Sequence, residues 1–423
     1  MKIFFDMVGC RLNQSEIERM AVEFRAAGNE IISDPAEADL IIINTCAVTA
    51  SAAADSRKKI RRAARLSNGE IIATGCYATV DPAAVSGLPG VVQVVPNSGK
   101  GNIGKEKLGE DWENPSRNIS RTPLPGKRKR TRAFIKVQDG CGNACSYCIT
   151  RIARGPGHSV SEKQIFHDIG FALAGGVKEI VLTGVNLGSW GRDIRDSLSL
   201  YDLVDKIQSE FDIPRIRLSS LEPWDLDDRI DKLLKLKSFC HHLHLPLQSG
   251  SDRILHQMNR KITRNEFLEK VKMLRELSPD IAITTDIMVG FPGEMEDDFH
   301  KTVEILKEIN FSGGHVFRYS PRPGTSAERI KKDRVPAKIA RERGLKIRDI
   351  LAETQKKYLD SFLDNNVEVL WERSSKLNGK WILRGLTENY IHVKGENDSD
   401  LNNCITEAHL NGYFKHGLTA EIN

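Results

Sequence analysis

Residues 140–148 read Gly-Cys-Gly-Asn-Ala-Cys-Ser-Tyr-Cys and follow residues 133–137, a short apolar run that predicts a β-strand. The loop carries Cys141, Cys145 and Cys148 in a C-x3-C-x2-C spacing, and its glycines permit tight curvature. Three soft thiolates on one loop can bind one metal centre. Structural zinc takes four protein ligands, and no fourth Cys or His follows at finger spacing, so only a distant residue would complete a zinc site. A 4Fe-4S cluster on three thiolates leaves one iron open to a substrate or cofactor, and we favour it.

Strand and helix patterns alternate from residue 133 to about residue 358. Six such units favour a partial β/α barrel or an open doubly wound sheet. Loops at the carboxyl ends of barrel strands build binding sites, so we expect the functional pocket at that end. The expected strands cover 133–137, 179–183, 215–219, 241–246, 281–289 and 314–317, and the expected helices cover 161–174, 200–211, 225–235, 264–277, 296–309 and a stretch from 337 onward.

The first 97 residues predict a separate parallel α/β domain with three further cysteines. Apolar runs alternate with helical patterns there, as in a parallel sheet covered on both faces. Cys10, Cys46 and Cys76 each follow one of these runs. The carboxyl ends of neighbouring parallel strands share one crevice, so the three thiols can converge on a second metal centre with an open coordination site. The alternative is that they are free cysteines packed as small hydrophobes.

The segments on either side of the central region differ from it in composition. Residues 98–132 lose periodicity and end in a basic cluster, which predicts a linker that is either simply solvated or in contact with RNA phosphates. Residues 364–423 contain short strands at turn spacing, which predict a small all-β barrel. Trp371 and Trp381 there serve either as stacking surface for RNA or as core. His242 and His244 alternate on an expected strand and point to one side, which suits the wall of a cleft.

The overall composition is that of an ordinary globular protein. Of 423 residues, 40% are hydrophobic and 28% are charged, and 62 Lys and Arg against 57 Asp and Glu give a net charge of +5. So small a balance does not indicate a polyanionic partner. No apolar run approaches the roughly 18 residues of a membrane span. We therefore expect a cytoplasmic protein, without membrane contact or a secretory signal, whose eight cysteines stay reduced.

The thiol loop, with Tyr147 before its third Cys, resembles that of the radical S-adenosylmethionine (SAM) enzymes. In those enzymes three thiolates hold a 4Fe-4S cluster whose open iron binds SAM. Nearly the whole chain is similar to the methylthiotransferases, which join an N-terminal three-cysteine domain, a radical SAM partial barrel and a C-terminal TRAM barrel. The stretches that carry this resemblance are residues 9–14, 44–49, 243–250 and 285–294.

The resemblance implies two 4Fe-4S clusters with SAM as the further cofactor. One cluster would lie on Cys141, Cys145 and Cys148 and reduce SAM to a 5′-deoxyadenosyl radical. The other would lie on Cys10, Cys46 and Cys76 and hold the sulfur that is methylated and transferred. By motif position, the residues expected to contact SAM are Tyr147, Gly184, Asn186, Ser219, Glu222, Gln248 and Gly290. Plain strand-ending turns explain the two glycines equally well.

Within the family, residues 44–49 and the basic residues 56–62 are similar to the branch that methylthiolates carbon 2 of N6-threonylcarbamoyladenosine in tRNA. Sister branches act on isopentenyladenosine in tRNA or on an aspartate of a ribosomal protein. A non-catalytic metal-binding RNA module is the alternative from another class. The implied partners are the tRNA anticodon stem-loop and an electron donor such as flavodoxin or ferredoxin. Arg151 and Val160 stand where relatives have Pro and Arg, which leaves the loop contacts there open.

Overall fold

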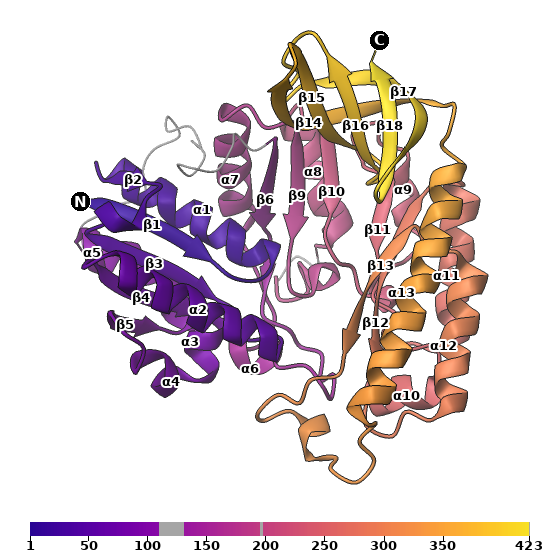
Figure 1. Cartoon of the computed structure of the whole chain (residues 1–423), viewed down its shortest axis with the longest axis horizontal. Coiled ribbons are helices and arrows are strands. Elements are labelled where there is room, and N and C mark those ends of the chain that lie inside the picture. The colour runs from indigo at the N-terminus through magenta and orange to yellow at the C-terminus, as the bar shows by residue number, and fades with distance from the viewer. Residues whose placement is uncertain (110–130, 195–197, 423) are drawn as a thin grey trace.

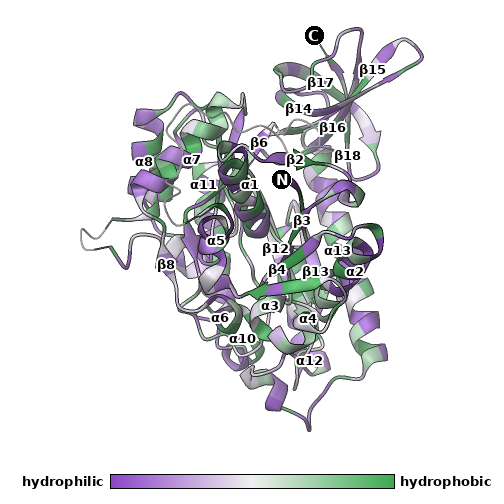
Figure 2. Ribbon diagram, turned by 90° about the vertical axis from the view of Figure 1, so that its left-hand side faces the viewer, coloured by the Kyte–Doolittle hydropathy of each residue, from purple (hydrophilic) through white to green (hydrophobic). Residues whose placement is uncertain are grey.

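The computed structural model describes residues 1–109, 131–194 and 198–422. Figure 1 shows three parts: an N-terminal sheet with its helices, an arc of parallel strands with helices outside it, and a closed barrel at one end. The view turned by 90° (Figure 2) agrees, with the closed barrel at the end of the molecule far from α10 (Asp252–Gln257). None of the helices in these described ranges is long and apolar enough to cross a membrane.

The N-terminal part is a five-stranded parallel sheet in the order β2-β1-β3-β4-β5. Its central strand, β3, is buried along its whole length because helices pack on both faces. The strands are β1 Lys2–Met7, β2 Glu30–Ile32, β3 Leu40–Thr45, β4 Glu70–Gly75 and β5 Val91–Val95. The helices are α1 Arg11–Ala26, α2 Ala50–Leu66, α3 Cys76–Val80, α4 Pro82–Ser86 and α5 Ile103–Leu108. The predicted parallel α/β architecture is confirmed.

The central part is the predicted partial barrel. Two parallel sheets, β10-β9-β6 and β11-β12-β13, are joined by bridges between Ile216 and Phe239 and between Ser220 and His244. Its strands are β6 Arg132–Lys136, β9 Glu179–Thr183, β10 Arg215–Leu218, β11 His242–His244, β12 Ala282–Val289 and β13 Gly313–Arg318, with a small hairpin of β7 Gln138–Asp139 and β8 His158–Ser159. The helices are α6 Thr150–Arg154, α7 Glu162–Ala174, α8 Leu200–Glu210, α9 Ile230–Leu234, α10, α11 Arg264–Leu277, α12 Glu296–Ile309 and α13 Ala337–Asp360.

Residues 366–422 form a closed five-stranded barrel in the order β14-β15-β16-β18-β17. The strands are β14 Asn366–Leu377, β15 Lys380–Thr387, β16 His392–Asn397, β17 Ile405–Phe414 and β18 Gly417–Ile422. Trp371 is fully buried in its core, and its Nε1 donates to the Oγ1 of Thr406 at 2.8 Å. A stacking role for Trp371 is therefore wrong, because β14 turns this side chain inward; Trp381 stays partly exposed beside Lys376.

The start of the predicted linker belongs to the N-terminal part. Residues 97–108 form a short 3-10 helix, η2 (Asn97–Asn102), followed by α5, and Ile103 is 1% exposed against α1 and β5. The sequence lacks a periodic pattern there because so few side chains make the contact. Residues 110–130, with most of the basic cluster, lie outside the described residues.

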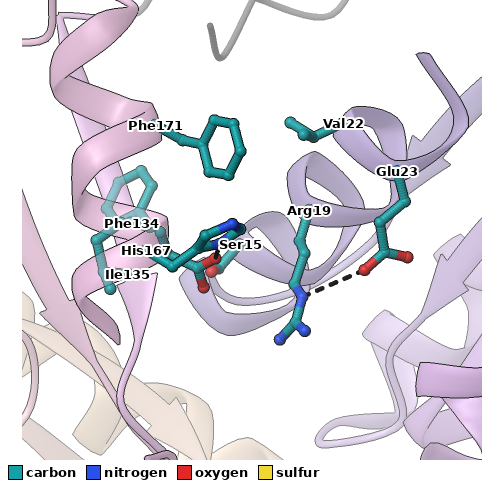
Figure 3. Close-up of a pocket in the computed structure, with 9 residues that line it drawn as sticks. Ser15, Arg19, Val22, Glu23, Phe134, Ile135, His167 and Phe171 are labelled. Atoms are coloured by element: carbon teal, nitrogen blue, oxygen red, sulfur yellow. Dashed lines mark ion pairs between the residues drawn. The ribbon is translucent and has the colours of Figure 1, made fainter. Parts of the chain in front are cut away.

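The N-terminal part and the barrel meet where α1 contacts β6 and α7 (Figure 3). Arg19 bridges the two helices, since it pairs with Glu23 at 3.3 Å and donates to Gln164 at 3.1 Å. The cavity drawn in Figure 3 has a volume of about 30 Å³. That is room for a few water molecules and too little for a substrate or cofactor.

Candidate active site

Three cysteines of the N-terminal sheet lie at the carboxyl ends of adjacent strands. Cys10 lies between β1 and α1, Cys46 follows β3 directly, and Cys76 begins α3 after β4. Because β1 pairs in parallel with β3 and β3 with β4, these strand ends are level. All three residues line one cavity, so the tertiary structure brings the predicted set together.

Two glycines allow the backbones at this edge to approach one another. Gly9 has a φ of +112°, and a Cβ there would lie 2.8 Å from the Cβ of Cys46. Gly75 has a φ of +100°, and a Cβ there would lie 2.4 Å from a backbone carbonyl oxygen of β3. Only glycine accepts both this conformation and this spacing, so Gly9 and Gly75 place Cys10 and Cys76 beside Cys46.

Amide side chains contact two of these thiols. The Sγ of Cys10 donates to the Oδ1 of Asn13 at 3.9 Å, and Asn13 in turn donates to backbone carbonyls at the ends of β1 and β3. Asn97 donates to the Sγ of Cys76 at 3.6 Å. Asn13 and Asn97 therefore fix the thiols relative to the sheet.

Burial disfavours the thiolate forms of Cys10 and Cys46. Burial raises the pKa of the Cys10 thiol, and it raises the pKa of Cys46 to about 11. Repulsion from a Cys76 thiolate adds to both pKa shifts, so the three groups are close enough to interact. Coordination to a metal deprotonates a thiol outright and would remove this penalty.

The second set of cysteines lies on the loop between β7 and α6. Gly140 opens this loop with a φ of +65°, and a Cβ there would lie 1.9 Å from the carbonyl oxygen of Pro156. Gln138 is fully buried beneath it and donates to the carbonyl oxygens of Asp139 and Gly140 at 2.8 and 2.9 Å. The loop is thus held tightly against the chain that leaves α6.

Donors from the protein point at all three sulfurs of this loop. The backbone N–H groups of Asn143 and Thr150 donate to the sulfurs of Cys141 and Cys148, each at 3.4 Å. Arg260 lies 4.0 Å from the Sγ of Cys145. Hydrogen bonds to sulfur are among the features that tune iron–sulfur clusters.

Arg260 is itself buried and is anchored by two partly buried partners. It donates to both carboxylate oxygens of Glu222 at 3.1 and 2.7 Å, and its guanidinium lies 4.5 Å from the ring centre of Trp224. Burial raises the pKa of Glu222 although Arg260 opposes the shift. Burial also raises the pKa of Cys145 to about 11, again against Arg260.

A cavity of about 1100 Å³ joins the N-terminal thiols to the barrel interior. Its barrel wall includes the carboxyl ends of β9 and β10, at Thr183 and Ser219, and inner-face residues of β11, β12 and β13. Its remaining wall comes from α13 and from the turn before β16 in the closed barrel. This volume slightly exceeds the usual range of about 300–1000 Å³ for ligand pockets, which leaves room for a nucleoside together with a cofactor.

Several predicted SAM-contact residues lie at or near this cavity. Gly184 and Ser219 line it, and the Ser219 Oγ is buried without a hydrogen-bond partner among the described residues. Asn186 is buried beside them; its N–H donates to Gln138 at 2.8 Å, and its Oδ1 has no partner within the described ranges. Ser219 and Asn186 therefore each keep a buried oxygen atom without a hydrogen-bond partner among the described residues, while Gly184 only lines the cavity.

The other predicted SAM contacts lie elsewhere. Tyr147 packs beside the small core around Phe291, and Glu222 is taken up by Arg260. Gln248 pairs through its backbone with β12 and is not in the cavity wall. Gly290 bends the chain against α13, since a Cβ there would lie 2.7 Å from the Cβ of Ala340. The turn explanation thus accounts for Gly290 without a ligand.

The donor set fits a cluster better than a single ion. In the described part of the chain, no group of three or more His, Cys, Asp or Glu side chains is placed to hold one metal ion. A cubane cluster requires a wider spacing of its ligands than a single ion does, because each thiolate binds a different iron. Two sets of three thiols, with donors to sulfur and unpartnered polar atoms beside them, suit clusters with an open iron.

Sequence reasoning missed the buried ion pairs that join the two thiol sites. Arg154 of α6 donates to Asn13 at 2.6 Å and pairs with Glu16 at 3.0 Å and with Asp139 at 2.9 Å. Asn13 contacts Cys10, and Asp139 begins the other thiol loop, so Arg154 connects both sites. The only sign of these ion pairs in the sequence was Glu16, an acidic residue among the apolar positions on the buried face of α1.

The closed barrel also reaches the cavity, through Tyr390. Arg11 donates to the Tyr390 hydroxyl at 2.7 Å, and the His242 ring stacks on Tyr390 with centroids 4.6 Å apart. His242 and His244 both contact the Oγ1 of Thr284 at 3.0 Å, which confirms that they share one side and line the cleft. Burial lowers the pKa of His242 well below the usual histidine value.

The chain matches known protein families over both of its α/β parts. Residues 135–306 match the Radical SAM superfamily, and residues 2–96 match the uncharacterized protein family UPF0004. Threonylcarbamoyladenosine tRNA methylthiotransferase MtaB of Thermotoga maritima is 36% identical over 92% of this chain and 89% of its own. The protein of that name from Bacillus subtilis is 34% identical, with 94% and 91% covered. The tRNA-2-methylthio-N(6)-dimethylallyladenosine synthase of Geobacillus kaustophilus is 34% identical, with 93% and 77% covered.

Among solved structures, the radical SAM methyltransferase TsrM of Kitasatospora setae, with cobalamin and a [4Fe-4S] cluster bound, superposes with a TM-score of 0.57 at 14% identity. The match covers 77% of this chain and 76% of that one, and it concerns the fold alone. The partial barrel with its three-cysteine loop defines a radical SAM protein. More narrowly, the chain belongs to the radical SAM methylthiotransferase family.

Proposed function

We propose that this protein is a tRNA methylthiotransferase that adds a methylthio group to carbon 2 of N6-threonylcarbamoyladenosine beside the anticodon. The product is 2-methylthio-N6-threonylcarbamoyladenosine. The observation that carries the proposal is the single cavity shared by the N-terminal thiols and the carboxyl ends of β9 and β10. A reaction that joins a sulfur, a radical cofactor and a nucleoside needs all three in one enclosed space.

In this proposal the two sets of thiols hold two 4Fe-4S clusters. Cys141, Cys145 and Cys148 bind the cluster that works with SAM, and Cys10, Cys46 and Cys76 bind the other. Bound there, the clusters and SAM supply the radical chemistry that an unactivated aromatic C–H bond requires. The chain itself orients the thiols through its glycines and amides, while Ser219 and Asn186 offer polar contacts to SAM.

Two observations favour threonylcarbamoyladenosine over dimethylallyladenosine, the substrate named for other relatives. The chain covers 89% and 91% of the two threonylcarbamoyladenosine enzymes, against 77% of the Geobacillus dimethylallyladenosine enzyme and 85% of that from Caldicellulosiruptor saccharolyticus. In addition, α2 follows the family segment at Cys46 and exposes Lys58, Arg61, Arg62 and Arg65. Their spacing of three and four puts these cations on one helix face, where they can contact tRNA phosphates.

Mass spectrometry of tRNA nucleosides tests the proposal. Enzyme reconstituted anaerobically with iron, sulfide, SAM and a reductant should convert N6-threonylcarbamoyladenosine in tRNA to its methylthio form. A deletion strain should lack that nucleoside and regain it when the gene is restored. Methylthio nucleosides that stay unchanged in the deletion strain would refute the tRNA function, and a changed mass of a ribosomal protein would indicate the aspartate reaction. Absence of 5′-deoxyadenosine under reducing conditions would leave only a non-catalytic RNA-binding module.

The same proposal implies a cytoplasmic protein, because cysteines that bind iron–sulfur clusters need a reducing compartment and because tRNA is found in the cytoplasm. A low-potential electron carrier such as flavodoxin or ferredoxin is the proposed reductant, since each turnover of the radical cofactor consumes electrons. Substrate turnover with either purified carrier in place of a chemical reductant tests this partner.

A further inference from the structure

The cavity has a second wall that the thiols and the proposed SAM contacts do not use. In Figure 1 the N-terminal sheet lies on one side of the cavity-lining strands β9 and β10, and β13 and α13 lie on the other side. On α13 the cavity-lining positions include Arg348, Leu351, Ala352 and Gln355, spaced by three and four as one helix face. A Cβ at Gly314 would lie 3.2 Å from Leu351, so α13 packs closely on β13.

This wall offers aromatic surface to a ligand. His315 and Phe317 of β13 both line the cavity, with ring centroids 6.2 Å apart. Phe317 is 41% exposed, which is unusual for so large an apolar side chain. Aromatic faces of this kind stack on nucleobases.

The same wall carries an unpaired positive charge. Among the described residues, three arginines line the cavity, and two of them are engaged: Arg154 pairs with Glu16 and Asp139, and Arg11 donates to Tyr390. Arg348 is exposed and has no ion pair or hydrogen bond to any described residue. A guanidinium facing a cavity without a protein partner is available to an anionic group of the ligand.

We propose that Arg348 binds the carboxylate of the threonylcarbamoyl group, while His315 and Phe317 support the base. This inference rests on the proposed function and names the substrate group by which the site selects its nucleoside. The threonyl group carries a carboxylate, and the dimethylallyl group is apolar. A guanidinium fork matches a carboxylate with two parallel hydrogen bonds, so Arg348 favours the first substrate and leaves its own charge unpaired with the second.

The experiment compares two synthetic anticodon stem-loop RNAs with the full-length reconstituted enzyme. One RNA carries N6-threonylcarbamoyladenosine and the other carries its methyl ester, in which a neutral group larger by one methyl replaces the carboxylate. Dissociation constants and methylthio formation are measured for the wild type, Arg348→Gln, Arg348→Lys and the control Arg341→Gln. Arg341 lies two turns earlier on α13, is exposed and does not line the cavity.

The wild type should bind the acid about tenfold to hundredfold more tightly than the ester, the range expected of one charge-assisted pair. Arg348→Gln should bind both RNAs with the wild type's affinity for the ester, Arg348→Lys should keep part of the preference, and Arg341→Gln should match the wild type. A full acid preference in Arg348→Gln overturns the inference. An equal loss for both RNAs also overturns it, because that result indicates a phosphate contact.

The outcomes separate this inference from the proposed function. A wild type that does not methylthiolate the acid RNA refutes the proposed function. A wild type that does so, with its preference unchanged in Arg348→Gln, refutes only the role of Arg348. A variant is folded if its iron content and circular dichroism equal those of the wild type. If Arg348→Gln does not fold, the partial acid preference expected of Arg348→Lys, which keeps the charge, tests the inference instead.

Discussion

Replacing Glu16 with Gln should strongly destabilise the folded protein around α1 and η2. The Glu16 carboxylate lies 2.7 Å from Lys100, 3.0 Å from Arg154 and 3.3 Å from Lys136. The side chains of Glu16 and Lys100 are each 7% exposed, and that of Arg154 is 2% exposed. This is therefore a buried network, in which removal of the Glu16 charge leaves Lys100 desolvated without a carboxylate partner.

The expected loss follows from which cations keep a partner. Arg154 and Lys136 retain Asp139, at 2.9 and 2.8 Å, but Glu16 is the one carboxylate paired with Lys100 among the described residues. Breaking a buried pair from one side costs about 3–5 kcal/mol. We expect Glu16→Gln to lower the free energy of unfolding by this amount, measured by urea denaturation followed by circular dichroism.

The control is Glu23→Gln on the same helix. Glu23 pairs with Arg19, which is 40% exposed, and burial raises the pKa of Glu23. A pair of this kind contributes at most about 1 kcal/mol, so the control should be nearly neutral. Equal unfolding free energies for the Glu16 and Glu23 variants would refute the reasoning.

The pH dependence gives a second check on Glu16. Burial alone would raise the pKa of Glu16, but Lys100, Arg154 and Lys136 hold it well below its ordinary value. Because the folded-state pKa is depressed, the stabilisation is complete above the unfolded-state pKa and is lost as the pH falls through the folded-state value. The difference between wild type and Glu16→Gln should therefore be constant near neutral pH and shrink only below about pH 4.3.

Three further predictions concern the thiols, the loop and a buried histidine. Cys46→Ser and Cys141→Ser should each lower iron from about eight to about four per reconstituted chain; an unchanged iron count in either variant would contradict its ligand role. Gly140→Ala should reduce iron content and lower the melting temperature, because its φ of +65° and the 1.9 Å approach to a carbonyl oxygen exclude a side chain, whereas Gly142→Ala, with open space around it, should match the wild type. His242 has a pKa well below the ordinary value because of burial, so the unfolded chain takes up a proton first and stability falls as the pH drops below about 6.5. In His242→Gln, the free energy of unfolding, measured by urea denaturation between about pH 5 and 7, should rise less steeply with pH than in the wild type, by up to about 1.4 kcal/mol per pH unit. Equal slopes in the two proteins would contradict the assignment.

Local pattern determined most of the architecture and the identity of the thiol residues. Apolar runs of strand length, alternating with helical patterns, predicted both the parallel sheet and the partial barrel, because each residue's environment there repeats with the period of its element. The positions of Cys10, Cys46 and Cys76 after three strands also predicted their convergence, since parallel strands end at one edge. The spacing of Cys141, Cys145 and Cys148 needed no tertiary information at all, because one loop holds them.

Contacts between distant parts of the chain were decided only by the tertiary structure. The sequence pattern around Glu16 does not predict its pairing with Lys100 and Arg154, because a buried ion pair can be recognised only once the positions of both partners are known. Trp371 and Tyr390 likewise lie in the same small barrel, yet the barrel's closure buries one and turns the other toward the cavity. Periodicity predicts which way a side chain faces within its own element, whereas the shared cavity and the unpaired Arg348 depend on how the three parts of the fold pack against each other.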